Sequence, residues 1–170
     1  MGIPDFGLLL LRVIVGLTFA AHGAQKAFGW WRGAGWTGWN GAVAGMGFRP
    51  ATPWAAIAIG AELLGGSLLA AGFLTPVAAM ALVGQSVVII GKAHWAKGYW
   101  NRDGGFEFPL ALGAGAAAVG LIGPGAISLD AVFGIALAGE VRALLIVVGL
   151  IGGALSYATT LVSRPPPATG

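Results

Sequence analysis

The sequence contains no cysteine and few charged residues. Of its 170 residues, 9% are Asp, Glu, Lys or Arg, whereas an ordinary soluble domain has about 25%. The absence of cysteine excludes disulfides, thiol redox catalysis, Cys-ligated zinc, iron–sulfur clusters and c-type haem. The shortage of charge excludes a soluble monomer, because a chain of this length cannot hide a composition that is 57% hydrophobic from water.

The charges that are present give no sign of a nucleic-acid-binding surface. The formal net charge is +3, and the nine Lys and Arg residues are scattered rather than clustered. Scattered basic residues between apolar segments are typical of the charges that orient a protein in a membrane. We therefore expect a lipid bilayer as the environment and no nucleic-acid partner.

Five apolar segments follow one another along the chain. They span residues 6–28, 54–74, 77–93, 106–123 and 143–162. An apolar segment in lipid must satisfy its own backbone, so each is predicted to be a helix, and the alternating pattern of a β-barrel is absent. The sequence thus predicts an all-α, polytopic transmembrane helical bundle with five spans. The fourth segment is short for a span and needs support from its neighbours.

Two connections, residues 29–53 and 94–105, are expected on the same side of the membrane. All seven tryptophans lie in them or beside them. Tryptophan prefers the lipid–water boundary, because its ring is apolar and its N–H needs a partner. The simpler interpretation is an aromatic belt. The alternative is that the first connection folds back as a cap on the bundle.

Eight of the polar or charged residues within these segments or at their edges, where an unpaired charge is costly, are candidate site residues. They are Arg12, His22, Gln25, Lys26, Glu62, Gln85, His94 and Glu107. On the first helix, Arg12, His22 and Lys26 share an arc of about 80° at ~100° per residue. We expect this arc to face the bundle interior, and the long side chain of Arg12 to pair with Glu62 on the next helix.

This polar column has two interpretations. One is structural, with a buried ion pair between Arg12 and Glu62 that fixes the register of the helices. The other is a ligand or proton site between the helices. Haem ligation by His22 and His94 is disfavoured, because they come from different depths and lack a surrounding apolar slot. Lys26, like Lys92, has a stem long enough to carry its ammonium group to the interface, which is the favoured interpretation for both.

Small residues recur at the spacing that lets helices approach closely in lipid. Gly16 with Ala20, and Gly149 with Gly153, are predicted packing contacts, with oligomerisation through the last helix as the alternative. The sequence shows no metal-ligand cluster, no nucleophile–base pair and no cofactor motif. An enzyme acting on its own is therefore the least favoured function.

Four motifs, in this order, resemble the DoxX family of small bacterial membrane proteins. They are R-x-x-x-G with H-G-x-Q-K-x-F-G at 12–29, E-x-x-G-G with a later Gly at 62–72, G-G-x-E at 104–107, and G-P-G with S-L-D at 123–130. The resemblance implies a four-helix membrane domain over residues 1–140. Residues 141–163 are then an additional fifth helix, and residues 164–170 a disordered tail.

The resemblance also implies membrane redox chemistry. Relatives include small subunits of thiosulfate:quinone oxidoreductase and partners in membrane-bound oxidative-stress assemblies. The implied function is a subunit of such a complex, with protein partners and with a quinone or lipid bound in the polar pocket; no cofactor is otherwise indicated. A non-catalytic scaffold and a small proton-coupled transporter using Glu62 are the alternatives.

The Lys and Arg distribution predicts an orientation. The Trp-rich side holds six basic residues and the other side holds one; the six are Arg32, Arg49, Lys92, Lys97, Arg102 and Arg164, and the one is Arg142. The positive-inside rule places the Trp-rich connections and the C-terminus in the cytoplasm, with the N-terminus outside. The expected location is the bacterial inner membrane.

Overall fold

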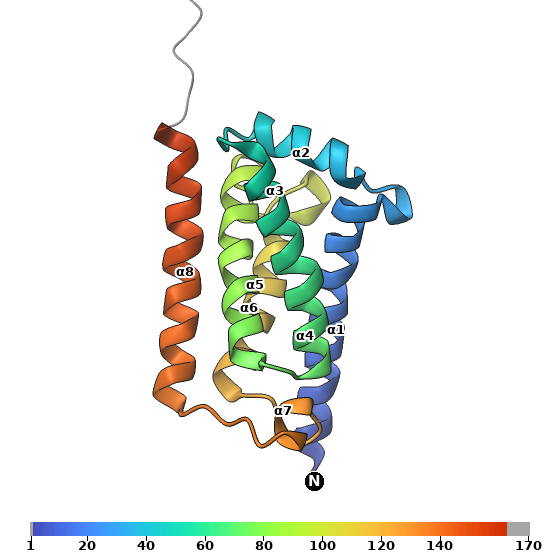
Figure 1. Cartoon of the computed structure of the whole chain (residues 1–170), viewed down its shortest axis with the longest axis vertical. Coiled ribbons are helices and arrows are strands. Elements are labelled where there is room, and N and C mark those ends of the chain that lie inside the picture. Colours follow the sequence, from blue (N-terminus) through green and yellow to red (C-terminus); the bar gives the residue numbers. More distant parts are fainter. Residues whose placement is uncertain (1, 163–170) are drawn as a thin grey trace, which may run out of the picture.

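The computed structural model describes residues 2–162, and every regular element in that range is a helix. Four helices are long and apolar enough to cross a membrane by length and composition: Ile3–Phe28, Ala51–Ala71, Thr75–Lys97 and Gly139–Val162. They stand side by side in one bundle (Figure 1). The predicted all-α polytopic bundle is therefore confirmed. The expected tail at 164–170, with Arg164, lies outside the described residues.

The spans include several local elements. The first is α1 (Ile3–Phe28). The second joins α3 (Ala51–Ile59), a π-helical turn η2 (Gly60–Leu64) and α4 (Gly65–Ala71); the third joins α5 (Thr75–Ile89), the π-helical turn η3 (Ile90–His94) and the 3-10 turn η4 (Trp95–Lys97); the last is α8 (Gly139–Val162). Four of the five predicted segments correspond to these spans, and each begins within a few residues of the observed start.

The short segment predicted as the fourth span forms α6 (Glu107–Ile122). It has 16 residues, or roughly 24 Å at the helical rise, against about 30 Å of hydrocarbon in a bilayer. It packs against α1, α5 and α8. A complete crossing by α6, and with it the five-span count, stays a prediction.

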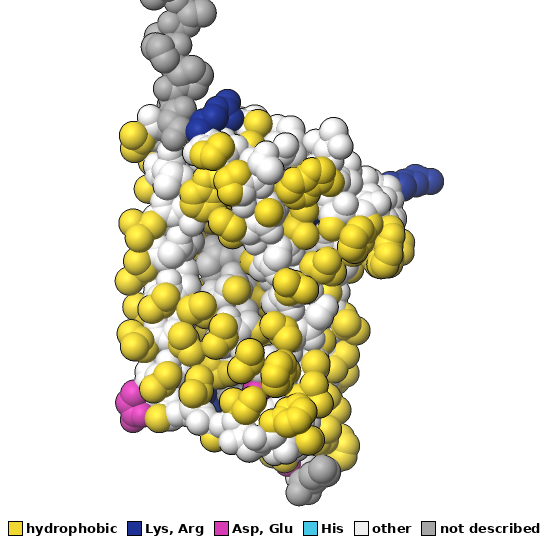
Figure 2. Space-filling view, viewed as in Figure 1, with side chains coloured by type: hydrophobic (Ala, Val, Ile, Leu, Met, Phe, Trp, Pro, Cys, Tyr) yellow, Lys and Arg dark blue, Asp and Glu magenta, His cyan; other side chains and the backbone are white. Residues whose placement is uncertain are grey.

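The outside of the bundle is apolar. Leu10 on α1, together with Leu144 and Leu155 on α8, is exposed over 60% or more of its surface. Figure 2 shows hydrophobic side chains along the full height of one face, with charges confined to its ends. So continuous an apolar surface needs lipid around it. The chain is thus a multi-pass membrane protein.

Glycines allow the helices to touch backbone to backbone. A Cβ on Gly16 would lie 2.6 Å from the Ala70 amide nitrogen and from the Gly66 carbonyl oxygen, and one on Gly84 would lie 2.9 Å from the Gly149 carbonyl oxygen. No side chain fits at such distances. Gly16 and Gly149 therefore serve helix packing, as predicted.

The Trp-rich end is covered by a helix of its own. Helix α2 (Gly35–Gly45) lies across the top of the bundle in Figure 1 and packs on α1 and α3. Val43 and Phe48 are buried there, with Trp39 and Trp54 packed against them. The first connection is thus a cap. The other tryptophans, such as Trp95, are largely exposed and keep the interpretation as an interfacial belt.

At the opposite end, the connection from α6 to α8 passes under the bundle. It contains the short helix α7 (Leu129–Val132). The two connections at the Trp-rich end contain the 3-10 turns η1 (Trp30–Arg32) and η5 (Asn101–Asp103). Each end of the bundle is therefore closed by ordered chain, and each end has its own buried polar cluster.

Candidate functional site

The predicted polar column is divided into two separate clusters. One surrounds Arg12 at the end of the bundle near α7. The other surrounds Glu62 toward the Trp-rich end. The clusters differ in whether their charged groups are fully partnered, and that difference separates a structural cluster from a candidate ligand site.

Arg12 is fully engaged by backbone carbonyls. It is 2% exposed, and its Nε donates to the oxygen of Ala70 at 3.2 Å. Its two terminal nitrogens donate to the oxygens of Pro124 and Ile127, each at 2.6 Å. Gly72 adopts a left-handed φ of +66° next to the guanidinium, and a side chain there would collide with it. Arg12 thus ties the α6–α7 connection to the end of α4.

Asp130 completes this cluster. Its two carboxylate oxygens accept from the backbone amides of Leu74 and Thr75, at 2.7 and 2.9 Å, where α5 begins. A carboxylate at a helix N-terminus satisfies free N–H groups and complements the helix dipole. Asp130 is fully buried. This cluster is structural, because every nitrogen of the Arg12 guanidinium and both oxygens of the Asp130 carboxylate bond to the backbone.

The expected pairing of Arg12 with Glu62 is therefore wrong. Helices α1 and α4 run antiparallel, and the contacts of Gly16 with Gly66 and Ala70 fix their register. That register places Arg12 beside Ala70, eight residues or about 12 Å along the helix from Glu62. An arginine side chain cannot span such an axial distance, so the shared face of Arg12 and Lys26 does not bring them to the same partner.

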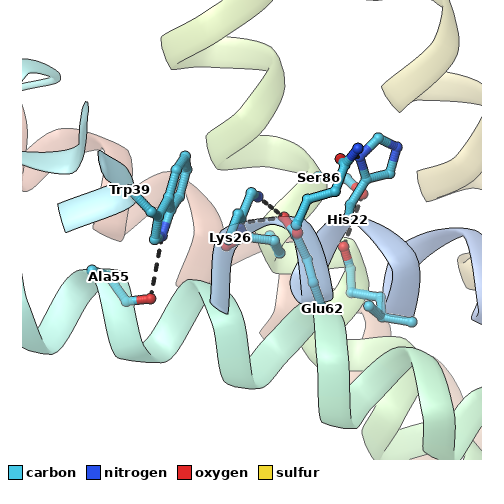
Figure 3. Close-up of polar contacts among 9 residues, drawn as sticks. His22, Lys26, Trp39, Ala55, Glu62 and Ser86 are labelled. Carbon is cyan, nitrogen blue, oxygen red and sulfur yellow. Dashed lines mark hydrogen bonds and ion pairs between the residues drawn. The ribbon is translucent and has the colours of Figure 1, made fainter. Parts of the chain in front are cut away.

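Lys26 is the partner of Glu62. The two side chains form an ion pair in the interior, and Gln85 Nε2 donates to the same carboxylate oxygen, Oε1, at 3.0 Å. Figure 3 shows Lys26 and Glu62 turned toward one another between α1 and η2. The Lys26 ammonium also lies 4.3 Å from the centroid of the Trp39 ring, a cation–π contact. The interpretation that Lys26 only extends to the interface is wrong.

The second oxygen of Glu62 has no such partner. Glu62 is 0% exposed, yet its Oε2 makes no hydrogen bond with any described residue. An unsatisfied polar atom in a buried site costs free energy and calls for a partner. Glu62 lies in the π-helical turn η2, an element that occurs frequently at functional sites.

A large apolar cavity of about 570 Å³ adjoins this cluster. Lys26, Glu62 and Gln85 are among the residues that line it, and most of the remaining wall is aliphatic or aromatic. A buried polar group in an otherwise apolar cavity of several hundred Å³ is the usual form of a small-molecule site. The Glu62 cluster and this cavity are the candidate functional site.

Comparison with known proteins identifies a family. The family described as DoxX matches residues 7–95, which is more than half of the chain. The chain belongs to the DoxX family. Searches of curated proteins and of solved structures gave no match.

The DoxX match includes the central residues of the candidate site. Lys26, Glu62 and Gln85 all lie within residues 7–95. His94 also lies within the match, whereas Glu107 and the whole of α8 lie beyond it. The polar centre of the site therefore belongs to the DoxX segment, and part of the cavity wall does not.

Two of the remaining predicted site residues, His22 and His94, lie on the wall of this cavity without bonding to Glu62. His22 lines it, with Nδ1 3.2 Å from Gln25 Oε1, and its ring meets Phe108 edge-on. His94 also lines the cavity, but its Nδ1 lies 2.7 Å from the Gly104 carbonyl oxygen. These groups belong to the cavity wall rather than to the Glu62 cluster.

Glu107 and Lys92 have structural partners. Glu107 accepts from the backbone amide of Asn101 at 3.0 Å and so shapes the α5–α6 connection. Lys92 lines the cavity, and its ammonium donates to Thr160 Oγ1 on α8 at 2.8 Å and lies over the Tyr157 ring. Lys92 therefore links α8 to the third span and does not simply extend to the interface.

The sequence analysis does not single out Asp130 or Trp39 as site or core residues. Asp130 is visible in the sequence only as part of the S-L-D motif, and no signal there joins it to the start of α5. Trp39 is one of several tryptophans in a glycine-rich connection, and only the fold of α2 brings it next to Lys26. Within residues 2–162, no group of three His, Asp or Glu side chains is placed to hold a metal ion.

Proposed function

We propose that this DoxX protein binds a quinone-type amphiphile in the cavity next to Glu62, as a membrane subunit of a redox complex. The observation that carries the proposal is Glu62 Oε2, a buried carboxylate oxygen without a partner among the described residues, on the wall of a large apolar cavity. A scaffold whose polar residues serve packing alone would be expected to satisfy that oxygen.

The chemistry of the site favours a head group that donates a hydrogen bond. An ionised carboxylate only accepts, and both donors within the protein, Lys26 and Gln85, bind Oε1. A hydroquinone hydroxyl would supply the missing donor to Oε2. The apolar wall suits an aromatic ring, and the Lys26 ammonium balances the carboxylate.

The assignment to a redox complex rests on the resemblance to small subunits of quinone-linked oxidoreductases. In such a complex this chain would hold the quinol in the membrane, and a protein partner would carry the groups that exchange electrons with it. The chain then contributes binding and orientation rather than a reaction of its own.

The proposed orientation places the capped, Trp-rich end in the cytoplasm of a bacterial cell. Among the described residues, four basic side chains lie in connections at that end, and Arg142 lies at the other; the four are Arg32, Arg49, Lys97 and Arg102. Labelling of single cysteines by an impermeant reagent in intact cells tests this proposal. Cysteine at Ala136 should react and cysteine at Asn101 should not, and the reverse pattern would invert the orientation.

The binding proposal is tested by equilibrium binding of decylubiquinol to the purified full chain in mild detergent. Glu62→Gln replaces the free acceptor by an amide that can present N–H instead, so quinol binding should weaken at least about tenfold. The same variant should lose less affinity for the oxidised quinone, whose carbonyl oxygens accept.

Glu140→Gln is the matched control, because it makes the same chemical change at an exposed position on α8. Its affinity should equal that of the wild type, and thermal unfolding should show that both variants are folded. A wild-type protein that binds no quinol, or a Glu62→Gln variant that binds it as well as wild type, would overturn the proposed function.

A further inference from the structure

The cavity next to Glu62 reaches the outside of the bundle. Its wall includes Ile57 on α3 and Val148 on α8, which are 58% and 47% exposed. Two residues on the same wall, Glu62 and Gln85, are buried. The space therefore runs from the polar cluster to the surface, and Figure 2 shows this face hollowed between α8 and α3.

The opening exists because α8 stands away from α3. The extensive contacts of α8 are with α5 and α6 rather than with α3. Glycines on α5 and α8 bring those two backbones together, which fixes α8 against α5 and leaves the side toward α3 uncovered. Gly152 lies on this uncovered side, lines the cavity, and has open space where a Cβ would be.

The level of the opening indicates what passes through it. Gly152 lies close to the middle of α8, a helix of 24 residues, so the opening faces the hydrocarbon layer of the bilayer and not the water at either surface. A water-soluble ligand would have no route to an opening at this level. A molecule already dissolved in the membrane reaches it directly.

We propose that the opening between α3 and α8 holds the hydrocarbon tail of the ligand whose head group binds Glu62. This inference rests on the proposed function, and it specifies the substrate class as a long-tailed amphiphile that enters sideways from lipid. Two independent observations support it: the unpartnered Glu62 Oε2 at the inner end and the lipid-facing opening at the outer end.

Part of this site lies beyond the family match. Helix α8 begins at Gly139, whereas the family match ends at residue 95. The polar centre for the head group therefore lies within the family segment, and one wall of the tail channel is added by a helix beyond it. Tail recognition can thus change through α8 without any change at Glu62.

The test compares two probes on the full chain in detergent: decylubiquinol, and ubiquinol-0, which has the same head group without a tail. Gly152→Phe adds a ring to the open space on the channel wall. It should weaken decylubiquinol binding at least about tenfold, since several buried methylenes lose their contacts. Ubiquinol-0 affinity should stay within about twofold, because that probe has no tail to exclude.

Two further variants act as controls. Gly152→Ala adds only a methyl group and should bind both probes like the wild type. Gly7→Phe places the same ring at another helical glycine with open space, on α1 and outside the wall of this cavity, and should also leave both affinities unchanged.

The outcomes separate the two proposals. If the wild type binds both probes and Gly152→Phe binds decylubiquinol normally, the tail channel is wrong while the head-group site stands. Equal weakening of both probes by Gly152→Phe would also contradict the channel, because the ring would then be acting on the head-group site. If neither probe binds the wild type, the proposed function fails and this inference fails with it.

Discussion

The two buried polar clusters of this bundle differ in one respect that separates structure from binding. At the α7 end, all the nitrogens of the Arg12 guanidinium donate to carbonyls, and both oxygens of Asp130 accept from amides. At the Trp-rich end, one carboxylate oxygen of Glu62 accepts hydrogen bonds from two donors. The other oxygen has no partner among the described residues.

The surroundings of the clusters differ in the same sense. Arg12 and Asp130 are enclosed by a connecting segment that they hold in place. Glu62 adjoins a cavity of about 570 Å³. Burial of a charge in a membrane is costly in both clusters. Of the two, only the Glu62 cluster has a charged-group oxygen for which no hydrogen bond with a described residue offsets that cost. A buried charge therefore indicates a ligand site when its partners are incomplete, and not merely because it is buried.

The largest effect on stability should follow from removing the Arg12 side chain. Arg12→Ala leaves three carbonyl oxygens without donors, each worth about 1–3 kcal/mol when buried, so the free energy of unfolding should fall by at least about 3 kcal/mol. Reversible unfolding in mixed detergent measures the loss. A decrease below about 1 kcal/mol would show that the carbonyls find other partners.

The second effect concerns the ion pair at the site. In a double-mutant cycle with Lys26→Met and Glu62→Leu, the two changes should couple by about 1–3 kcal/mol, because each single change leaves the other charge unpaired. The double variant should therefore be more stable than the sum of the single losses predicts. Strict additivity would mean that this ion pair is not formed in the folded protein.

A smaller effect is expected at the start of α5. Asp130→Ala removes the acceptor for two backbone amides, Leu74 and Thr75, and should cost about 1–2 kcal/mol, as for other helix caps. Quinol affinity of the folded variant should remain at the wild-type value, because Asp130 lies outside the cavity. Weakened binding by a folded Asp130→Ala protein would show that the two clusters are connected.

The smallest effect is the sharpest test of their separation. Arg12→Ala and Glu62→Leu share no partner, so their stability losses should add within about 0.5 kcal/mol. The same unfolding measurement on the double variant checks this. Coupling as large as that between Lys26 and Glu62 would restore the direct Arg12–Glu62 contact that the sequence suggested.

The sequence predicts the bundle well because the relevant signal is local. Apolar segments of sufficient length mark the spans, and small residues such as Gly16 and Gly149 mark the faces where helices touch. The same reasoning also brings Glu62, Gln85 and Lys26 into one set of candidate residues, although it favours the membrane interface for the Lys26 ammonium group. These inferences need only the composition and periodicity of single segments.

The pairing of those residues requires information that periodicity does not contain. Arg12 and Lys26 share a face of α1, but the axial register set at Gly16 assigns them to different levels of the neighbouring helix. The π-helical turn at Glu62 has no visible signal in the sequence. The role of Asp130 depends on a contact between residues far apart along the chain, which only the folded connection creates.

The most direct test of which cluster meets the ligand is photo-crosslinking with an azido-quinone that carries a decyl tail, followed by mass spectrometry of labelled peptides. We predict labelling of α3–η2, α5 and α8 around the cavity, suppressed by excess decylubiquinol and reduced in Glu62→Gln. Labelling concentrated around Arg12 and α7, and unaffected by Glu62→Gln, would contradict the assignment of the Glu62 cluster as the ligand site.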